Sequence, residues 1–286
     1  MAPETNAALY VVATPIGNLK DVTLRALEVL KSVEIVAAED TRVTSKLLNH
    51  YGITARKLIA LHQHNEQRAA PEVIAHLNAG RSVALASDAG TPAFSDPGAR
   101  LVSLVREAGF SVVPIPGPNA VAAALSVSGF PGPQFLFYGF LPVRGSERRR
   151  AIEALASIPH ALVFYEAPHR VRDSLADLSA TLGASRRIVI ARELTKLFES
   201  IHVCSLGEAA QWLSADPNRE KGEFVLIVEG AGHTAQANET DAHRVLEILL
   251  ETLPVKQAAA LASRITGGRK NELYARALAL KRASGQ

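Results

Sequence analysis

The segment Ala8–Leu19, ALYVVATPIGNL, joins an apolar, β-branched run to a loop that contains proline and glycine. Short runs of this kind, bounded by turn residues, are typical of buried parallel strands. The same pattern recurs at Glu34–Ala38, Ser82–Ala86 and Ser111–Ile115. We therefore expect these four runs to form one sheet.

Segments with helical spacing alternate with these runs, at Thr23–Ser32, Ala69–Ala79 and Ala99–Ala108. Gly80 and Gly109 follow the last two, where a left-handed helix cap would fall. Alternation of strands and helices predicts an α/β lobe with helices on both faces of its sheet.

A second series of elements predicts a second lobe. Its strands are expected at Phe135–Phe140, Ala161–Tyr165, Arg187–Ala191, Ser200–Cys204 and Phe224–Glu229, and its helices at Glu147–Ala156, Val171–Leu182 and Leu206–Leu213. Polar, Gly- and Pro-containing stretches at Gly139–Ser146 and Ala231–Asp241 are interpreted as linkers. We therefore expect an N-terminal α/β lobe over 1–138, a second α/β lobe over 139–232 and a basic helical segment over 242–286.

Composition narrows the class of protein. Hydrophobic residues make up 48% of the 286, enough for a sizeable core, and the apolar runs are too short to cross a bilayer. The single cysteine, Cys204, excludes an intramolecular disulfide and a clustered zinc or iron–sulfur site. We expect a soluble, cytoplasmic protein without membrane anchor or metal.

Positive charge is concentrated near the C-terminus. The net charge is only +3, yet Val255–Gln286 holds seven Lys or Arg against one Glu. A basic tail favours a polyanionic partner, because each phosphate contact releases condensed counterions. A solvated helical face is the alternative interpretation.

Three loops that follow predicted strands are rich in Gly and Pro: Thr14–Leu19, Ser87–Pro92 and Pro114–Ala120. Ligands of open α/β sheets bind at the carboxyl ends of the strands. Glycine lets the backbone approach a ligand, and proline limits the entropy lost on binding. The loops lack the G-x-G-x-x-G and G-x-x-x-x-G-K-[ST] patterns, so NAD and ATP have no positive signal.

Eight ordered motifs then identify a resemblance. They are TPIGNL at 14–19, AAEDTR at 37–42, SDAGTP at 87–92, PGPNA at 116–120, GFLP at 139–142, FYEAPHR at 164–170, ARELTK at 191–196 and KGEFVLIVEG at 221–230. Together they resemble the ribosomal RNA small subunit methyltransferase I family, a branch of the tetrapyrrole methylase superfamily. Tetrapyrrole-modifying relatives typically carry a G-D-P-type sequence where this chain has Ser87–Gly90, which argues against a tetrapyrrole acceptor.

The resemblance implies a two-lobed tetrapyrrole methylase-like fold with S-adenosylmethionine between the lobes, a small C-terminal helical segment and a homodimer. The implied acceptor is the ribose 2′-hydroxyl of a decoding-centre cytidine in 16S ribosomal RNA of the small subunit. A tetrapyrrole or protein acceptor and a non-catalytic assembly factor remain alternatives. The implied cofactor contacts are Pro15, Ile16, Gly17, Asp88, Ala89, Gly90, Thr91, Pro92, Gly117, Pro118, Asn119 and Ala120 of the first lobe, and Tyr165, Glu166, Ala191 and Arg192 of the second.

A ribose hydroxyl is a poor nucleophile until its proton is leaving, so a nearby base would help. Each candidate also has a structural alternative, such as a helix cap or an ion pair, and pure positioning would leave no base at all. The candidates are Glu39, Asp40, Glu166, His169, Glu193 and Lys196.

Cations in two regions are candidates for RNA contacts. Arg148, Arg149 and Arg150 follow the first predicted linker, although three consecutive residues cannot share one helix face. The predicted helices Val255–Arg264 and Lys270–Lys281 have helix-turn-helix proportions, with a helical bundle packed on the body as the alternative. Arg269, Lys270 and Arg276 are expected to be exposed there.

Overall fold

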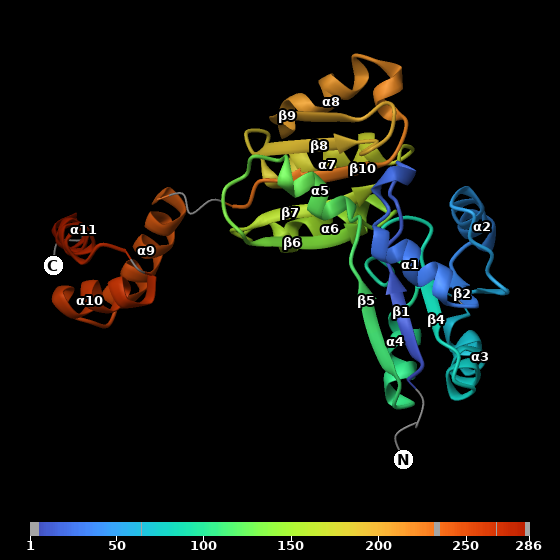
Figure 1. Ribbon diagram of the computed structural model, residues 1–286. Helices are drawn as coiled ribbons and strands as arrows, with labels where there is room; N and C mark the ends of the chain where they lie inside the picture. Colours follow the sequence, from blue (N-terminus) through green and yellow to red (C-terminus); the bar gives the residue numbers. More distant parts are fainter. Residues whose placement is uncertain (1–5, 64, 232–234, 267, 284–286) are drawn as a thin grey trace. The chain divides into compact units, whose positions relative to one another are not determined.

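The computed structural model describes residues 6–63, 65–231, 235–266 and 268–283. The chain forms two compact units: one spans 1–154 and 161–228, and the other 155–160 and 229–286. The first unit contains two five-stranded sheets, and the second is helical (Figure 1).

The first sheet is wholly parallel, in the order β3-β2-β4-β1-β5. Its strands are β1 (Ala8–Val12), β2 (Ile35–Ala38), β3 (Lys57–Ala60), β4 (Val83–Ala86) and β5 (Ser111–Ile115). The helices of this lobe are α1 (Leu24–Ser32), α2 (Thr41–His50), α3 (Glu66–Asn78) and α4 (Ala99–Glu107), with a short 3-10 turn η1 (Leu19–Asp21).

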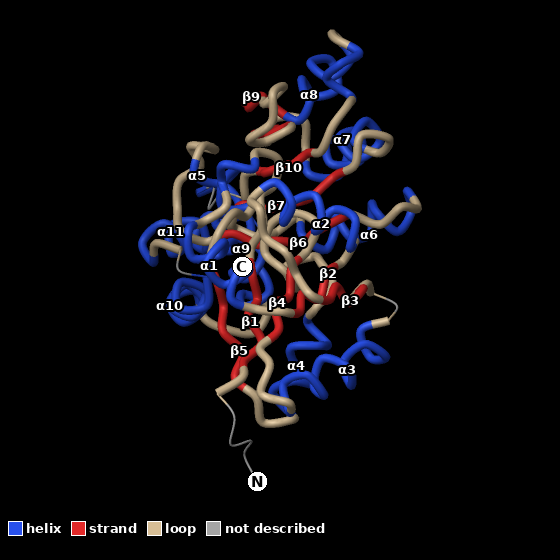
Figure 2. Tube along the Cα trace, turned by 45° about the vertical axis from the view of Figure 1, so that its right-hand side comes forward, coloured by secondary structure: helices blue, strands red, loops and turns tan. Residues whose placement is uncertain are grey.

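Two apolar layers hold this sheet between helices. On one face Leu9 and Leu85 pack with Val73 of α3 and Leu101 of α4, which lie side by side in Figures 1 and 2. On the other face Val12 packs with α1 and α2. Every residue of β2 and β4 is buried, as a central parallel strand requires. The predicted α/β lobe is confirmed.

The second sheet is mixed, in the order β6-β7-β10-β8-β9. Its strands are β6 (Phe135–Phe140), β7 (Ala161–Glu166), β8 (Arg187–Arg192), β9 (Ser200–Ser205) and β10 (Phe224–Val228), and β10 runs antiparallel to both of its neighbours. The helices of this lobe are α5 (Ala120–Ser126), α6 (Gly145–Leu155), α7 (Val171–Leu182) and α8 (Leu206–Ser214), with a 3-10 turn η2 (Pro217–Glu220).

Helix α5 packs on one face of the second sheet. Val121 and Ala124 of α5 contact a buried layer that includes Val163, Val189 and Ile227. Strand β10 is fully buried, including Phe224 at 2% exposure. This helix reaches the sheet directly from the PGPNA loop of the first lobe, so the loop is positioned by both lobes.

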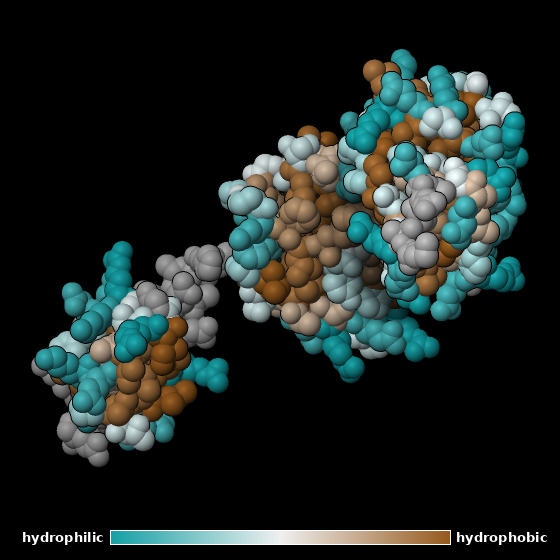
Figure 3. Space-filling model, turned by 60° about the horizontal axis from the view of Figure 1, so that its bottom comes forward, coloured by the Kyte–Doolittle hydropathy of each residue, from teal (hydrophilic) through white to brown (hydrophobic). Residues whose placement is uncertain are grey.

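The C-terminal unit contains α9 (Ala235–Leu250), α10 (Val255–Thr266) and α11 (Lys270–Ala283). Its own small core includes Leu246, Ala259 and Leu273. Apolar Ile248, Ile265, Tyr274 and Leu278 also reach its surface, and Figure 3 shows apolar and hydrophilic side chains together on this unit.

Both predicted linkers differ from the structure. Gly139 and Phe140 end β6, and Gly145 already begins α6, so the expected lobe boundary at 138/139 falls inside a strand of the second sheet. Helix α9 begins at Ala235, within the second predicted linker, whose residues 232–234 lie outside the described residues. In both places polar, Gly-containing sequence led to a predicted linker where the structure has a regular element. The polar residues occur there because one edge of β6 and one face of α9 lie toward solvent.

Candidate functional site

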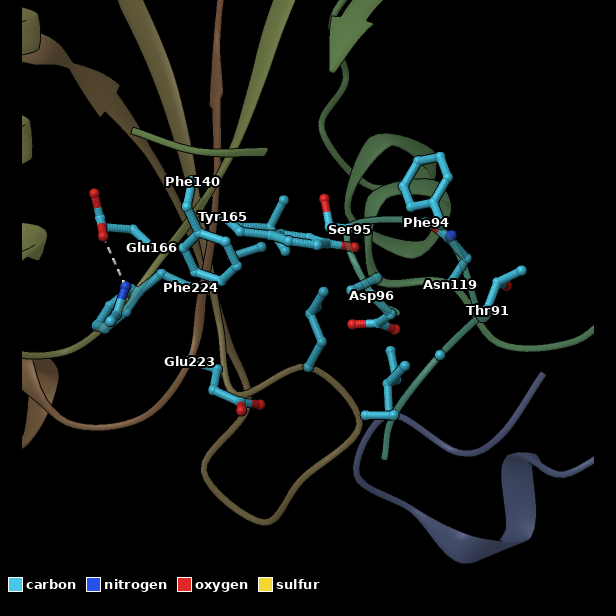
Figure 4. Close-up of a pocket in the computed structure, with 18 of the residues that line it drawn as sticks. Thr91, Phe94, Ser95, Asp96, Asn119, Phe140, Tyr165, Glu166, Glu223 and Phe224 are labelled. Carbon is cyan, nitrogen blue, oxygen red and sulfur yellow. Dashed lines mark hydrogen bonds between the residues drawn. The ribbon is translucent and has the colours of Figure 1, made fainter. Parts of the chain in front are cut away.

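A cavity of about 320 Å³ lies between loops of the two lobes of the first unit (Figure 4). This volume is at the lower end of the range for small-molecule sites, which is roughly 300–1,000 Å³. Its described lining residues are Ile16, Ala89, Gly90, Thr91, Phe94, Ser95, Asp96, Asn119, Ala120, Phe140, Tyr165, Glu166, Ala167, Pro168, Ala191, Leu194, Glu223, Phe224 and Val225.

The three Gly- and Pro-rich loops meet at this cavity, as predicted. Thr14 and Gly90 exchange backbone hydrogen bonds of 2.8 and 3.0 Å, which join the first loop to the second. The Thr91 hydroxyl donates to the Pro118 carbonyl at 3.2 Å, which joins the second loop to the third. Three segments far apart in sequence therefore form one continuous wall.

Two glycines permit the close packing of these loops. A Cβ on Gly117 would lie 2.9 Å from the Ala13 Cβ. A Cβ on Gly17 would lie 2.5 Å from the Lys196 Cγ and 2.8 Å from the Thr195 hydroxyl oxygen, in the loop that follows β8. The Asn18 N–H also donates to that hydroxyl at 3.1 Å. The TPIGNL loop is thus held against the second lobe.

Aromatic side chains from the second sheet form the opposite wall. Phe94 of the first lobe stacks on Phe137 with ring centroids 4.7 Å apart, and the Tyr165 ring contacts both Phe137 and Phe140. Burial raises the pKa of Tyr165 to about 12, and the nearby Asp96 carboxylate contributes to this shift. The phenol therefore stays protonated at neutral pH and can act as a hydrogen-bond donor.

The charged residues among the described lining are all acidic: Asp96, Glu166 and Glu223. Burial raises the pKa of Asp96 to about 6, and the charges of Glu39 and Asp88 act in the same direction. An acidic, partly buried cavity attracts a cationic ligand.

The candidates of the AAEDTR motif have structural roles outside the cavity wall. Asp40 caps α2, accepting from the Arg42 N–H at 2.8 Å, and pairs with the Arg42 guanidinium. That hydrogen-bonded guanidinium lowers the pKa of Asp40 to about 2. Asp88 accepts from the Asp40 N–H at 2.9 Å, and Glu39 from the Asp88 N–H at 3.3 Å. These carboxylates tie two strand ends together.

Candidates from the second lobe are also engaged. Glu166 is buried and accepts hydrogen bonds from the Ser174 hydroxyl at 2.5 Å and the Ala167 N–H at 2.9 Å. The Lys196 ammonium binds Glu193 at 2.9 Å and Glu223 at 2.8 Å. His169 is exposed and lies outside the cavity lining.

Nine of the predicted cofactor contacts line the cavity: Ile16, Ala89, Gly90, Thr91, Asn119, Ala120, Tyr165, Glu166 and Ala191. The other seven are not among the described lining residues: Pro15, Gly17, Asp88, Pro92, Gly117, Pro118 and Arg192. The Arg192 guanidinium, for example, donates to the carbonyls of Lys221, Phe198 and Asn218. It braces the second lobe and does not reach the cavity.

Ten residues of the described lining were not predicted from the sequence: Phe94, Ser95, Asp96, Phe140, Ala167, Pro168, Leu194, Glu223, Phe224 and Val225. Several of them lie within or beside the motifs quoted above, so their proximity to a motif could have indicated a place in the cavity wall. Asp96 lies in the same strand-to-helix connection as SDAGTP, four residues beyond it.

The arginine cluster differs from the expectation of three RNA-facing cations. Arg148 is 5% exposed, and its guanidinium pairs with Asp177 at 2.6 Å. Arg149 reaches the same carboxylate at 3.2 Å with half of its side chain exposed, and Arg150 is exposed. Arg148 is therefore a structural residue and offers no free cation to a phosphate.

In the C-terminal unit the expected cations are at the surface. Arg269, Lys270 and Arg276 are all exposed. Arg269 forms an ion pair with Glu272 at 3.2 Å, and Arg276 lies 3.9 Å from Glu247. Such exposed ion pairs contribute little to stability, so these arginines can readily exchange a glutamate for another anion.

No described helix is long and apolar enough to span a bilayer. The described residues contain no group of three or more His, Cys, Asp or Glu positioned around a common metal site.

Comparison with known proteins assigns this chain to the tetrapyrrole methylase class. The family model described as Tetrapyrrole (Corrin/Porphyrin) Methylases matches residues 8–210, and the RsmI C-terminal HTH domain matches 236–281. Among solved structures, the methyltransferase CobJ aligns with a TM-score of 0.60 at 20% identity, over 79% of this chain and 95% of its own. A cobalt precorrin-4 methyltransferase gives 0.58 at 16% identity, over 78% and 95%. These two likenesses concern the fold.

Curated relatives define the particular family. Ribosomal RNA small subunit methyltransferase I of Escherichia coli O157:H7 is 53% identical, over 97% of this chain and 96% of the relative. The protein of that name from Pseudomonas aeruginosa is 49% identical, over 94% and 96%. The chain belongs to the ribosomal RNA small subunit methyltransferase I family.

The Arg148–Asp177 pair gives a test of the structural assignment. We expect Asp177→Ala to lower the free energy of unfolding by roughly 3–5 kcal/mol, because it leaves a buried guanidinium without its partner. Urea unfolding measures the change. Asp173→Ala, an exposed position on the same helix, is the matched control. A loss of stability no larger than in the control would contradict a structural role for Arg148.

Proposed function

We propose that this protein uses S-adenosylmethionine to methylate the ribose 2′-hydroxyl of a decoding-centre cytidine in 16S ribosomal RNA. The names of the relatives, at about half identity over nearly the whole chain, support the ribosomal acceptor. Action on ribosomal subunits implies a cytoplasmic location.

The observation that carries the choice of donor is the acidic cavity between the lobes. S-adenosylmethionine carries a sulfonium and an ammonium, and the lining carboxylates Asp96, Glu166 and Glu223 suit such a cation. The backbone of the glycine loops and the ring of Tyr165 offer polar and flat surfaces to the rest of the donor. When bound, the donor supplies an electrophilic methyl group.

The contribution of the protein is alignment and exclusion of water. An in-line displacement is accelerated most by holding the two reactants close together and correctly aligned. In favourable cases this alignment lowers the activation barrier by about 7–11 kcal/mol. Two contacts hold the walls of the cavity in one arrangement. They are the stacking of Phe94 on Phe137 and the backbone pairing of Thr14 with Gly90. Our proposal therefore assigns the loops to donor binding and the aromatic wall to shielding the reaction from solvent.

We assign RNA binding to exposed cations. Arg269 and Lys270 lie at the start of α11, and Arg276 follows nearly two turns later in the same helix. These exposed cations suit phosphate contacts, and the match to a helix-turn-helix domain supports this role. Arg149 and Arg150 of α6 are further candidates on the first unit.

We also infer a homodimer. Strand β9 is an edge of the second sheet, and Ile201 and Val203 on it are 39% and 44% exposed. Leu197 and Phe198, in the preceding loop, are 89% and 67% exposed. An apolar edge strand left in water invites pairing, so a second copy is the expected cover.

Methyl transfer and donor binding together test the proposed function. We expect calorimetry to detect S-adenosylmethionine binding, and labelled methyl to appear on a cytidine 2′-oxygen of purified small subunits. If the labelled methyl group appeared on a tetrapyrrole or on a protein instead, the proposed RNA acceptor would be wrong. Donor binding with no transfer to any of these would favour a non-catalytic assembly factor.

Gly17→Ala tests the role of the TPIGNL loop. Its added Cβ would collide with Thr195 and Lys196, and overpacking of about 1–3 kcal/mol would weaken S-adenosylmethionine binding by roughly tenfold or more. Calorimetry measures the affinity. Gly145→Ala is the control, because its Cβ would lie no closer than 3.3 Å to any of the neighbouring atoms, the nearest being in the half-exposed Arg149 guanidinium. Equal affinity in the two variants would contradict the assignment.

The C-terminal cations have their own test. We expect Arg269→Ala with Lys270→Ala to weaken subunit binding and to reduce the salt dependence by about one unit of slope per lost contact, with donor affinity unchanged. Filter binding at several salt concentrations measures this. Arg25→Ala with Lys31→Ala, two exposed cations of α1, is the matched control. Identical salt slopes in both pairs would refute the assigned role.

A further inference from the structure

We propose that the ring of Phe140 stacks on the base of the acceptor nucleotide at the mouth of the cavity and thereby positions the ribose for methyl transfer. This inference rests on the proposed function, because it names a residue that receives the RNA at the same site. Neither the donor contacts nor the RNA contacts expected from the sequence include Phe140.

Phe140 lies at the rim of the aromatic wall. It lines the cavity, yet it is 52% exposed. Of the other aromatic residues in the described lining, Phe224 is 2% exposed, and Phe94 and Tyr165 are half-buried. Figure 4 shows Phe140 beside Tyr165, and their ring centroids are 5.6 Å apart. Phe140 therefore presents a flat apolar surface to solvent at the edge of the cavity.

A β-bulge in β6 turns Phe140 toward the cavity. The register of β6 against β7 shifts between Phe137 and Gly139, so Tyr138 is an extra residue in the strand. Gly139 has a φ of 84°, which glycine permits. Side chains alternate along a regular strand, so without the extra residue Phe140 and Phe137 would lie on opposite faces. With the bulge, both rings contact Tyr165 on the cavity side, and bulges that redirect a side chain in this way are common next to active sites.

Two arginines fix the backbone that follows Phe140. The Arg170 guanidinium donates to the Leu141 carbonyl, and the Arg148 guanidinium donates to the Val143 carbonyl at 3.3 Å. Leu141 is itself 2% exposed. The ring of Phe140 therefore projects from a fixed backbone, which limits the entropy lost when a ligand stacks on it.

Size and charge indicate which part of the RNA meets Phe140. The cavity volume of about 320 Å³ is at the lower end for one small ligand, so a bound donor leaves no room for the acceptor base. The carboxylates of Asp96, Glu166 and Glu223 repel phosphates, so the RNA backbone stays outside the cavity. A neutral, flat base on the rim satisfies both constraints.

The chain beyond Phe140 suits the rest of an RNA strand. Arg144 follows in the next loop with 81% of its side chain exposed, and Arg149 of α6 has 52% exposed. Exposed cations of this kind contact phosphates and orient the nucleic acid. Unpaired RNA is typically recognised by stacking its bases on aromatic side chains. The combination of an exposed ring and nearby cations therefore fits an unpaired nucleotide.

Phe140→Ala tests the inference against Phe135→Ala. The control removes a ring of similar exposure, 47%, from the same strand but outside the described lining. Loss of one base-stacking contact should lower kcat/KM for methyl transfer to small subunits by about 5- to 150-fold, with the control unchanged. Calorimetry should show a much smaller change in S-adenosylmethionine affinity, which also establishes that the variant is folded.

A series of replacements separates stacking from apolar packing. Phe140→Tyr and Phe140→Trp keep a flat ring and should retain most of the wild-type kcat/KM. Phe140→Leu keeps an apolar side chain but has no ring, so its kcat/KM should be close to that of Phe140→Ala. A side chain that only filled space would show the opposite order, because leucine is tolerated better than tryptophan where volume is limited.

Each outcome decides the inference. Wild-type protein that transfers no methyl group to the subunit would overturn the proposed function and this inference together. With an active wild type, equal kcat/KM values in Phe140→Ala and Phe135→Ala would overturn the inference alone. The same holds if Phe140→Leu is as active as the two aromatic replacements, or if Phe140→Ala loses as much donor affinity as kcat/KM.

Discussion

The pairing of Thr14 with Gly90 is the contact on which the site depends. Two backbone hydrogen bonds join the loops that follow β1 and β4, neighbouring strands of the first sheet. Gly90 has a φ of 83°, in the left-handed region that side chains disfavour, so glycine suits this position. The Thr91–Pro118 bond then extends the pairing to a third loop. The fold therefore brings the loops together, and a few backbone and hydroxyl contacts fix them.

The third loop connects this wall to the second lobe. Its Asn119 accepts hydrogen bonds from the N–H groups of Val121 and Ala122 and so starts α5. That helix lies on the second sheet, where Val121 and Ala124 are buried. A displacement of the second sheet would thus move the cavity wall of the first lobe. The cavity and the packing of the two lobes are consequently coupled.

Much of this arrangement could be predicted from sequence, for a physical reason. Central parallel strands such as β2 and β4 are apolar throughout, so they stand out, and their following loops are known to converge. Strand β3 was missed because Lys57 and Ala60 at its ends are exposed, as an edge strand allows. Arg148 was misassigned because its partner Asp177 lies 29 residues away. Asp96 was missed because left-handed backbone at Ala93 and Ser95 leaves no signal in residue type.

The acidic lining also affects what happens after the reaction. In the proposed reaction the sulfur of the donor loses its positive charge when the methyl group leaves, while the acidic residues of the lining keep theirs. The used donor is then held less firmly than a fresh one by Coulomb attraction, in a cavity where low dielectric magnifies the difference. Under the proposed function, the charge of the lining therefore favours exchange of spent for new donor.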